Sequence, residues 1–579
     1  MKRIYKYAKG YYKYVFLSPL FVIMEAVLEV LIPLVNKNLI DVGIKNQDLK
    51  YIFVAASIIL GMSILSLIGG VGSGFFATKA SAGLGHNIRK ELYRKVQTFS
   101  FANIDKFQTA SLITRLTTDV NNVQQSFQMT IRICFRAPIL FLAALITSCV
   151  QRWELGLIFL FIIPVLLLAV IVVMFFANRY FKQMFKQIDK LNLVVQENIN
   201  GIRTVKSFTN EDEETTKENL ASERVKYFAT KGEALGALFS PISQFLMYTS
   251  TTLIVFISVQ LMVGDNPSML PGELQLFINY GIQILSSLMM VCGVMMMLII
   301  SHQSVIRILE VLDETPDIKD PLDPVKEVKS GSVEFKDVNF SYSKDMDKLA
   351  LKDVSFRVES GQTIGIFGAT GSSKTTLISL IDRLYDTTSG SVLVGDVDVK
   401  NYSLFSLREA VSVVLQKNTL FSGTIKSNML WGNENATDEE IKQALDDAQA
   451  SEFVFKLQDG INSKVEEGGV NFSGGQKQRL CIARALIKKP KILILDDSTS
   501  AVDTKTDSLI RDAFKNHIPN TTKFIISQRI SSIKDADKII ILDDGKLIAF
   551  GNHDELMNND DYRRIYLAQI KASPKGGAN

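Results

Sequence analysis

The stretch TIGIFGATGSSKTT, Thr363–Thr376, joins a short apolar strand to a helix through a turn rich in glycine and serine. In such a turn the backbone N–H groups at the helix start hold phosphate oxygens, the lysine adds positive charge, and a hydroxyl can ligate Mg²⁺. The sequence therefore predicts a phosphate-binding loop within an α/β domain. Its residues are Gly368, Ala369, Thr370, Gly371, Ser372, Ser373, Lys374, Thr375 and Thr376.

One residue departs from the usual loop. The position before the lysine is normally glycine, but here it is Ser373. If that position requires a positive φ angle, a side chain there costs about 1 to 2 kcal/mol. A chance glycine-rich turn is the alternative interpretation of this motif taken alone.

Two further motifs follow in the same half of the chain. Lys491–Asp496, KILILD, is an apolar strand that ends in a carboxylate, as a nucleotide-bound Mg²⁺ requires. Between this strand and the phosphate loop lies Asn471–Arg479, NFSGGQKQR, which leads into a helix. Together the motifs favour a nucleotide site over a chance turn.

The motifs and their order resemble the ATP-binding cassette family, whose signature sequence contains Ser473, Gly474, Gly475 and Gln476. The resemblance implies that ATP and Mg²⁺ bind here, with Tyr342 stacking on adenine. Gln416 resembles the glutamine that links the metal site to the membrane domain, and the implied metal ligands are Thr375, Gln416 and Asp496. Ser500–Asp503 resembles the loop between paired sites. In the family's dimers each ATP lies between the phosphate loop of one chain and the signature of the other.

Two departures from the family affect the chemistry. The residue after Asp496 is Asp497 where the family has glutamate, so the carboxylate is withdrawn by about one C–C bond, ~1.5 Å. A displacement of about 1 Å can lower a rate about 100-fold. The expected switch histidine is Gln528, which can hydrogen-bond a phosphate but cannot carry a proton at neutral pH. His517, the nearest histidine, is interpreted as a surface residue.

Asp497 and Gln528 are interpreted as degenerate positions of the catalytic glutamate and the switch histidine. Tolerated variants of an active site are the alternative interpretation. Three departures beside an unchanged signature favour a chain whose own site hydrolyses ATP poorly and whose signature completes the site of a different partner chain. This pattern resembles the degenerate-site subunit of bacterial heterodimeric multidrug exporters.

The first half of the chain has the composition of a membrane protein. The sequence is 579 residues long, 47% hydrophobic and 21% charged, with a mean hydropathy of +0.17, which excludes a disordered chain. Six apolar runs are long enough to span a bilayer. They cover residues 14–35, 51–77, 133–150, 155–178, 235–263 and 275–300.

The predicted fold is a six-helix all-α transmembrane domain over residues 1–312 with long cytosolic helical extensions, then a linker over 313–330 and an α/β nucleotide-binding domain over 331–579. The linkers after spans two and four are long and rich in Lys and Arg, which places them and both termini in the cytosol of a multi-pass plasma-membrane protein. They keep helical periodicity, so extended helices are favoured over soluble inserts. By resemblance, their tips at 102–107 and 208–213 couple the two domains.

The charge distribution, the cysteines and the methionines bear on partners, metal sites and a substrate cavity. Residues 1–305 hold 28 Lys and Arg against 19 Asp and Glu, and residues 306–579 hold 36 against 41, which does not favour nucleic acid as a partner. The cysteines are too far apart to indicate a disulfide framework or a zinc site, and are interpreted as buried apolar residues. The methionine-rich sixth span suits a cavity for many apolar shapes, but ordinary lipid-facing or helix-packing methionine is the favoured interpretation. These residues are Cys134, Cys149, Cys292, Cys481, Met289, Met290, Met295, Met296 and Met297.

Charged residues also occur in or near the spans. Arg132, Arg136 and Arg152 lie at predicted span ends, from which their side chains could snorkel to the interface. Glu25 and Glu29 are one turn apart in the first span, where a carboxylate is a candidate for cation or proton handling. A wet vestibule or the membrane edge is the alternative setting for these two carboxylates.

The function predicted from the sequence is an ATP-driven exporter subunit, an ATP hydrolase whose partners are a second half-transporter chain, membrane lipids and an amphipathic drug or lipid as substrate. A dedicated lipid or peptide exporter is one alternative. An ATP-gated channel or regulator, in which nucleotide binding is only a signal, is another. Steady substrate-stimulated ATPase activity separates a pump from a channel.

Overall fold

The computed structural model describes residues 2–263, 268–497, 502–560, 562–564 and 566–567. The chain forms two compact units. The first contains Met1–Gln97 and Ala110–Glu314, and the second contains Thr98–Thr109 and Thr315–Asn579. The short segment 98–109 therefore belongs to the second unit, although it is flanked in sequence by the first.

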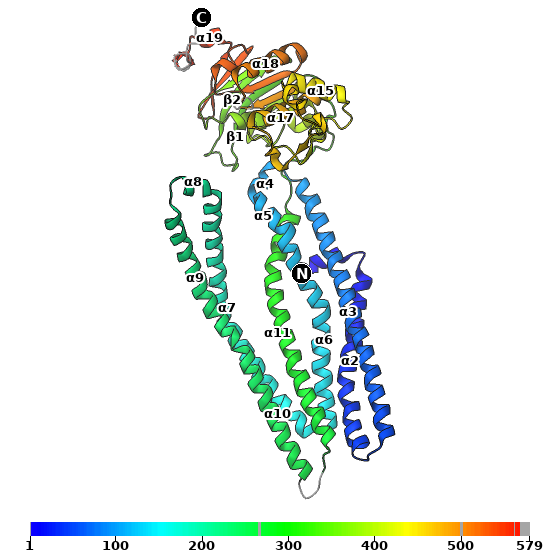
Figure 1. Cartoon of the computed structure of the whole chain (residues 1–579). Coiled ribbons are helices and arrows are strands. Elements are labelled where there is room, and N and C mark those ends of the chain that lie inside the picture. Colours follow the sequence, from blue (N-terminus) through cyan, green and yellow to red (C-terminus); the bar gives the residue numbers. More distant parts are fainter. Residues whose placement is uncertain (1, 264–267, 498–501, 561, 565, 568–579) are drawn as a thin grey trace. The chain divides into compact units, whose positions relative to one another are not determined.

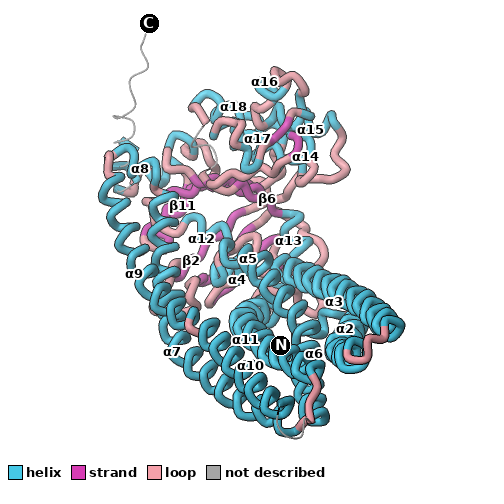
Figure 2. Tube along the Cα trace, turned by 60° about the horizontal axis from the view of Figure 1, so that its bottom comes forward, coloured by secondary structure: helices cyan, strands magenta, loops and turns pink. Residues whose placement is uncertain are grey.

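The first unit is helical (Figure 2). Within the described residues, six of its helical stretches are long and apolar enough to cross a membrane, and each overlaps one predicted span. The stretches are Tyr12–Ile44, Leu49–Gln97, Thr109–Gln151, Trp153–Asn200, Glu211–Val263 and Pro271–Met295. The helices are α1 (Lys2–Tyr5), α2 (Tyr12–Asn38), α3 (Leu49–Gln97), α5 (Thr109–Thr114), α6 (Val120–Gln151), α7 (Trp153–Asn200), α8 (Ile202–Ser207), α9 (Glu211–Ala237), α10 (Phe239–Val263) and α11 (Pro271–Asp313).

The prediction of extended helices in place of soluble inserts is confirmed. α3 continues for 49 residues and α7 for 48, far more than the roughly 20 that span a bilayer. α9 returns alongside α7, so the two form a long hairpin, while α2, α3, α6 and α11 pack beside one another (Figure 1). Pro19, Pro138 and Pro164 lie inside helices, as transmembrane helices tolerate.

The membrane-spanning helices meet in an apolar core. Its buried side chains include Ala26 of α2, Phe159 of α7 and Tyr280 of α11. The Tyr280 hydroxyl donates a hydrogen bond to the backbone oxygen of Val30, 2.9 Å away. A buried phenol needs such an acceptor, so this bond joins α11 to α2.

Arg136, predicted to lie at a span end, pairs with Glu25 and Glu29 of α2. The interpretation of the cysteines as buried residues was wrong for two of them. Cys134 and Cys149 are exposed on the surface of the single chain, and Cys481 alone of the three described thiols is buried. An apolar residue on a membrane helix need not be buried within its own chain. The side chain of Cys292 lies outside the described residues.

The second unit is built on three sheets. A four-stranded antiparallel sheet has the order β2-β1-β4-β5, and a six-stranded sheet has the order β12-β11-β3-β10-β9-β6 and is parallel except for β12. β7 and β8 form a two-stranded ribbon. The strands are β1 (Val333–Phe340), β2 (Leu351–Val358), β3 (Thr363–Phe367), β4 (Ser389–Val394), β5 (Val397–Asp398), β6 (Val411–Val414), β7 (Gly423–Thr424), β8 (Lys464–Val465), β9 (Ile492–Asp496), β10 (Thr522–Ile526), β11 (Lys538–Asp543) and β12 (Lys546–Gly551).

Helices cover the six-stranded sheet and form a second subregion beside it. Strands β9 and β10 are buried along their whole length, which explains the apolar run of β9 before Asp496 and the apolar residues 524–526 of β10. The helices are α4 (Phe101–Phe107), α12 (Lys374–Ser379), α13 (Leu404–Ala410), α14 (Ile425–Met429), α15 (Asp438–Asp447), α16 (Ser451–Val454), α17 (Gly474–Ile487), α18 (Thr504–His517) and α19 (His553–Leu556). His517 ends α18 half-exposed and contacts Asp447 at 2.5 Å.

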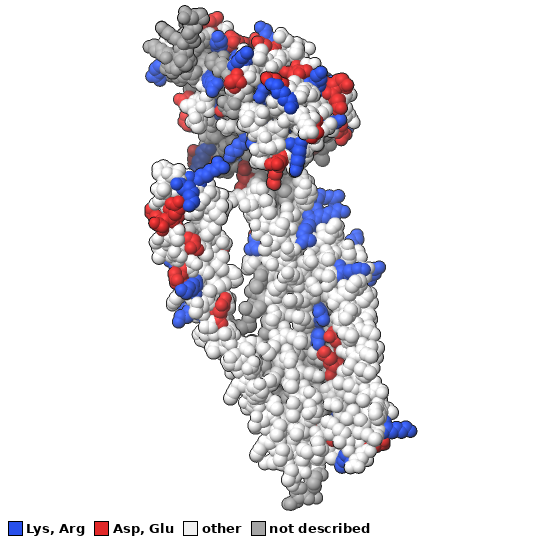
Figure 3. Space-filling view, in the orientation of Figure 1, with Lys and Arg blue, Asp and Glu red and all other residues white. Residues whose placement is uncertain are grey.

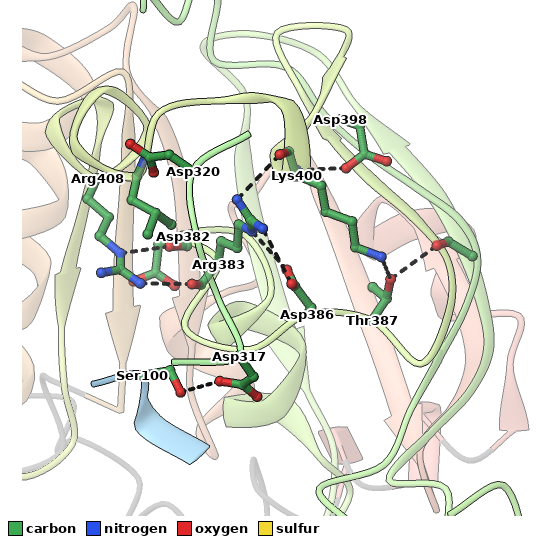
Figure 4. A network of polar contacts seen from close by, with 12 residues as sticks. Ser100, Asp317, Asp320, Asp382, Arg383, Asp386, Thr387, Asp398, Lys400 and Arg408 are labelled. Atoms are coloured by element: carbon green, nitrogen blue, oxygen red, sulfur yellow. Dashed lines mark hydrogen bonds and ion pairs between the residues drawn. The ribbon is translucent and has the colours of Figure 1, made fainter. Parts of the chain in front are cut away.

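The segment 315–330 packs against the second unit. Val325 bonds the backbones of Asn401 and Ser403 at 2.9 and 3.0 Å, and Asp320 accepts the Leu404 N–H at 2.9 Å. Figure 4 shows the surrounding network, in which Arg408 donates to the backbone oxygen of Arg383 at 2.9 Å. These bonds hold the segment that follows the sixth span against the turn between β5 and the start of α13.

Candidate functional site

The phosphate loop has the geometry that its sequence predicts. β3 ends at Phe367, the loop follows, and α12 begins at Lys374 with its first-turn N–H groups directed back at the loop. A Cβ at Gly368 would lie 2.3 Å from the backbone oxygen of Leu542, so only glycine fits there. Ser373 has φ 70° and ψ 27°, in the left-handed region. The position that is normally glycine therefore does require a positive φ angle.

This strain gives a first prediction. Ser373→Gly removes about 1 to 2 kcal/mol of left-handed strain but adds about 0.5 to 1 kcal/mol of unfolded-state entropy, so the net gain is about 0.5 to 1 kcal/mol. Thermal unfolding of the full chain should shift upward by roughly 2 °C. The matched control is Ser372→Gly, because Ser372 is buried and accepts a hydrogen bond from Lys374 at 3.3 Å. An equal gain in both variants contradicts the strain argument.

The lysine of the loop is held by the loop itself. Lys374 Nζ donates to the backbone oxygens of Gly368 and Ala369 at 2.9 and 2.7 Å. Burial lowers its pKa, while the charges of Asp496 and Asp497 act in the opposite direction. A phosphate group in the loop would add a further negative charge, which favours the protonated lysine. Lys374 is thus placed as an electrostatic clamp for an anion.

Oxygen atoms suitable for Mg²⁺ meet beside the lysine. The Thr375 hydroxyl donates to Asp496 Oδ2 at 2.9 Å, and Asp496 is only 3% exposed. Burial raises the pKa of Asp496, helped by the neighbouring charge of Asp497, and the Thr375 hydrogen bond and Lys374 lower it. A buried carboxylate beside a hydroxyl suits a hard cation with oxygen ligands. The residues therefore fit Mg²⁺, and the ion would offset the charge that burial disfavours.

Asp497 and Gln528 lie against each other at the open side of the site. Gln528 Nε2 donates to Asp497 Oδ2 at 3.4 Å, and the Asp497 N–H donates to the backbone oxygen of Ile526 at 3.2 Å. Asp497 has φ 47°, a left-handed conformation that aspartate tolerates better than most residues. Burial raises its pKa, opposed by Lys374 and Arg529. The short carboxylate is thus fixed at its backbone and bonded to an amide that cannot take its proton.

Residues from three of the predicted groups converge on one cavity of about 290 Å³. The cavity is lined by residues of the phosphate loop, of the predicted metal site and of the two degenerate positions. Ile526 also lines the cavity, and the sequence interpretation missed it. The sheet order β3-β10-β9-β6 explains the convergence, because the carboxyl ends of adjacent parallel strands meet at one edge. The lining residues are Thr370, Gly371, Ser373, Lys374, Thr375, Thr376, Gln416, Asp496, Asp497, Ile526 and Gln528.

Tyr342 stands at the margin of this site. Its hydroxyl lies 2.9 Å from Thr376 Oγ1, and its ring meets those of Phe340 and Tyr385 edge-on at 4.8 and 5.2 Å. The side chain remains 54% exposed, so aromatic surface is available for a planar group. The position fits the predicted role beside an adenine.

The signature residues lie elsewhere in the unit. Ser473 is the N-cap of α17, its Oγ accepts the Gln476 N–H at 3.3 Å, and Gln476 Oε1 accepts the Ser473 N–H at 2.9 Å. This reciprocal capping box fixes the helix start and leaves the first-turn N–H groups of Gly474 and Gly475 facing outward from the helix. Within the described chain, none of the residues that line the 290 Å³ cavity comes from the signature. Ser500 and Ala501 lie outside the described residues, and Asp503 caps α18.

One cytosolic tip predicted to couple the domains packs within the second unit. Helix α4 starts with a capping box at Ser100, and Asp105 Oδ2 accepts the Tyr385 hydroxyl at 2.7 Å. The ring of Phe101 lies 6.1 Å from that of Tyr385. Burial raises the pKa of Tyr385, and so does its bond to Asp105. Tyr385 thus contacts both this tip and Tyr342 at the nucleotide site.

Comparison with known proteins agrees with this geometry. Residues 15–288 match the family model of the ABC transporter transmembrane region, and residues 351–500 match the family model described as ABC transporter. The ABC transporter ATP-binding protein YfiB of Bacillus subtilis is 35% identical over 98% of this chain and 99% of the relative. YknU of the same organism is 32% identical over 98% and 97%. The structure of a bacterial Atm1-family ABC exporter with ATP bound superposes with a TM-score of 0.83 at 22% identity, covering 97% of this chain and 99% of that one.

Two independent lines of evidence thus coincide: phosphate-loop and metal-site residues that line one cavity of the second unit, and six helical stretches of the first unit, among the described residues, that are long and apolar enough to span a membrane. The relatives match over the full length of both units. The chain therefore belongs to the ABC transporter family and is a multi-pass membrane half-transporter that carries a transmembrane region and an ATP-binding domain in one polypeptide.

Proposed function

We propose that this chain is one half of a heterodimeric ATP-driven exporter, in which its own ATP site hydrolyses slowly and its signature completes the hydrolytic site of a different partner chain. The observation that carries the proposal is the contact between Asp497 and Gln528 at 3.4 Å. Both residues that should handle the proton of an attacking water depart from the family at once, and they bond to each other.

The chemistry of this pair supports slow hydrolysis. A general base must reach the attacking water, and Asp497 is one methylene too short while its backbone is held at Ile526. The Gln528 amide can donate to a phosphate oxygen but cannot exchange a proton at neutral pH. Lys374, Thr375 and Asp496 keep the geometry for binding. The site is therefore suited to retaining ATP with Mg²⁺ more than to cleaving it.

The signature supports the other half of the proposal. Ser473 and Gln476 form an intact capping box, so α17 presents ordered amides and the positive end of its dipole. These groups suit the γ-phosphate of an ATP bound to the phosphate loop of another chain. The two faces of this cassette would thus serve two different nucleotides.

Transport follows from coupling the cassette to the spans. ATP binding would draw the two cassettes together, and the α4 tip with the second tip at 208–213 would carry that movement to the membrane helices. The packing of α4 on Tyr385 supports this role for the first tip. Lys and Arg in the long linkers favour cytosolic termini and a plasma-membrane location. Amphipathic drugs or lipids are the proposed substrates.

The direct test asks which chain keeps its nucleotide. The full chain is purified with its co-purifying half-transporter, loaded with a photoreactive, γ-labelled ATP analogue and Mg²⁺, and crosslinked after one turnover. We expect uncleaved triphosphate on this chain and diphosphate on the partner chain. Diphosphate on both chains at equal rates, or isolation of this chain solely as a homodimer, contradicts the proposal.

Restoring the family's residues should change little. Asp497→Glu with Gln528→His repairs the acid–base groups, but the partner's signature that faces this site is expected to be damaged. The left-handed backbone at Asp497 also suits glutamate less well than aspartate. Steady-state ATPase activity of the heterodimer should rise less than tenfold. A rise of tenfold or more, about 1.4 kcal/mol of barrier, means that these two residues alone limited the site.

A further inference from the structure

Three charged side chains meet inside the membrane-spanning helices. Arg136 of α6 contacts Glu25 Oε1 at 2.9 Å and Glu29 Oε1 at 2.6 Å, and both carboxylates belong to α2. Glu25 is only 7% exposed. In Figure 3 a small group of red and blue atoms interrupts the white surface of these helices. Charges are costly at this depth, so their presence requires a structural or functional reason.

The charges in this cluster do not balance. Two ionised carboxylates face one guanidinium, which leaves one negative charge in a medium where an uncompensated charge is strongly disfavoured. Arg132 lies one turn earlier on α6, beside Gly74 of α3, and in the described part of the chain it forms no ion pair with either carboxylate. A purely structural clasp between α2 and α6 would need only one of the two glutamates.

Buried acceptor atoms without hydrogen-bond donors indicate where a positively charged group could bind in this cluster. Within the described residues, two buried acceptor atoms have no hydrogen-bond partner, Glu25 Oε2 and Gln283 Oε1. One buried donor, Arg136 Nε, also has no partner. Gln283 reaches the cluster from α11, where its Nε2 donates to the backbone oxygen of Glu29 at 3.0 Å. Two unpaired acceptor atoms, one on α2 and one on α11, thus accompany one surplus negative charge.

Helix α3 closes the fourth side. A Cβ at Gly70 would lie 3.1 Å from Glu25 Oε1, and one at Gly69 would lie 3.2 Å from Glu25 Cβ. The paired glycines therefore let α3 approach the carboxylate closely. Larger residues would push against Glu25, so its side chain lies in a notch that these glycines leave open.

We infer that Glu25, Glu29, Arg136 and Gln283 form an intramembrane binding site for the ammonium group of an amphipathic ligand. An ammonium has three donors and one positive charge, which matches the two free acceptors and the surplus negative charge. Arg136 neutralises one carboxylate and so limits the site to a single charge. The inference rests on the proposed function, because it makes this ligand a transported substrate.

A matched pair of ligands tests the site. Dansylamidopentylammonium and dansylamidopentanol differ mainly in an ammonium against a hydroxyl, and both are titrated by fluorescence against the full-length transporter in phosphatidylcholine nanodiscs without ATP. We expect the ammonium compound to bind at least tenfold more tightly than the alcohol. Glu25→Gln should remove this preference while changing the affinity for the alcohol less than twofold. Glu154→Gln, which alters an exposed carboxylate at the start of α7, should leave the preference intact.

Folding of the variant is expected to be preserved, because Glu25→Gln leaves Glu29 and Arg136 as a balanced pair, and thermal unfolding checks this. Should Glu25→Gln fail to fold, Glu29→Gln removes the same surplus charge and must abolish the preference equally. Equal affinity of the two ligands for the native protein, or a preference that persists in the folded variants, overturns the inference. A proton held by Glu25 in place of a ligand gives that same lack of preference.

The binding assay separates this inference from the proposed function, because it requires neither hydrolysis nor transport. If both ligands are exported by ATP but bind equally well, the export proposal stands and the ammonium site is wrong. If the ammonium compound binds with the Glu25-dependent preference but neither ligand stimulates ATPase activity or moves across the membrane, the ammonium site stands and its ligand is not a transported substrate.

Discussion

Replacing Gly474 with aspartate is expected to lower the ATPase rate of the heterodimer at least 100-fold. Gly474 is the first residue of α17, so its substituent faces the position proposed for the partner's γ-phosphate. A carboxylate there would repel the phosphate and cancel the positive end of the helix dipole. Folding should survive, because an acidic residue in the first turn of a helix is itself stabilising. Steady-state ATPase activity of the purified pair measures the loss.

Two control variants separate the effects of charge and bulk at the signature from the effect of nucleotide binding at this chain's own site. Gly474→Ala adds bulk without charge and should lose much less activity than the aspartate variant. Lys374→Ala removes the clamp that bonds Gly368 and Ala369, so it should weaken nucleotide retention on this chain while turnover falls less than tenfold. A lysine variant as inactive as Gly474→Asp, with fold and dimer intact, means that this chain's own site hydrolyses ATP or must be filled for the partner's turnover. Near-normal ATPase activity of the Gly474→Asp variant would show that the signature of this chain does not complete a hydrolytic site on the partner chain.

This chain expressed without its partner is expected to hydrolyse ATP at least 100-fold more slowly than the pair. In a homodimer both composite sites would contain Asp497 and Gln528, so neither would have a base of full length or a residue that exchanges a proton near pH 7. The partner chain should supply a glutamate after its metal-binding aspartate and a switch histidine. ATPase activity of the chain alone and of the reconstituted pair, at equal protein concentration in nanodiscs, gives the ratio.

Binding provides the control for this second prediction. The chain alone should still bind ATP with Mg²⁺, because Lys374, Thr375 and Asp496 are in place, so a slow rate with retained binding points to the chemical step. Comparable ATPase rates for the chain alone and for the pair would show that Asp497 and Gln528 support hydrolysis. The heterodimer proposal would then have to be abandoned.

The sequence by itself determined the parts of this protein. Short motifs assigned the phosphate loop, the carboxylate of Asp496 and the signature, because their chemistry depends on residue types at fixed local spacing. Hydropathy located six spans, because each must cover the bilayer without help from distant residues. For Ser373 the sequence indicated a cost only on the condition of a positive φ angle, and the structure shows that the condition is met.

Tertiary structure decided what depends on residues far apart in the chain. The order β3-β10-β9-β6 differs from the order of these strands in sequence, and it alone brings Gln528 to Asp497 and places Ile526 in the cavity. The packing of α6 against α2 pairs Arg136 with Glu25 and Glu29, which their positions in the sequence did not indicate. Local patterns carry no information on such pairings, because the energy that selects them comes from burying charge and apolar surface between elements that meet only in the folded chain.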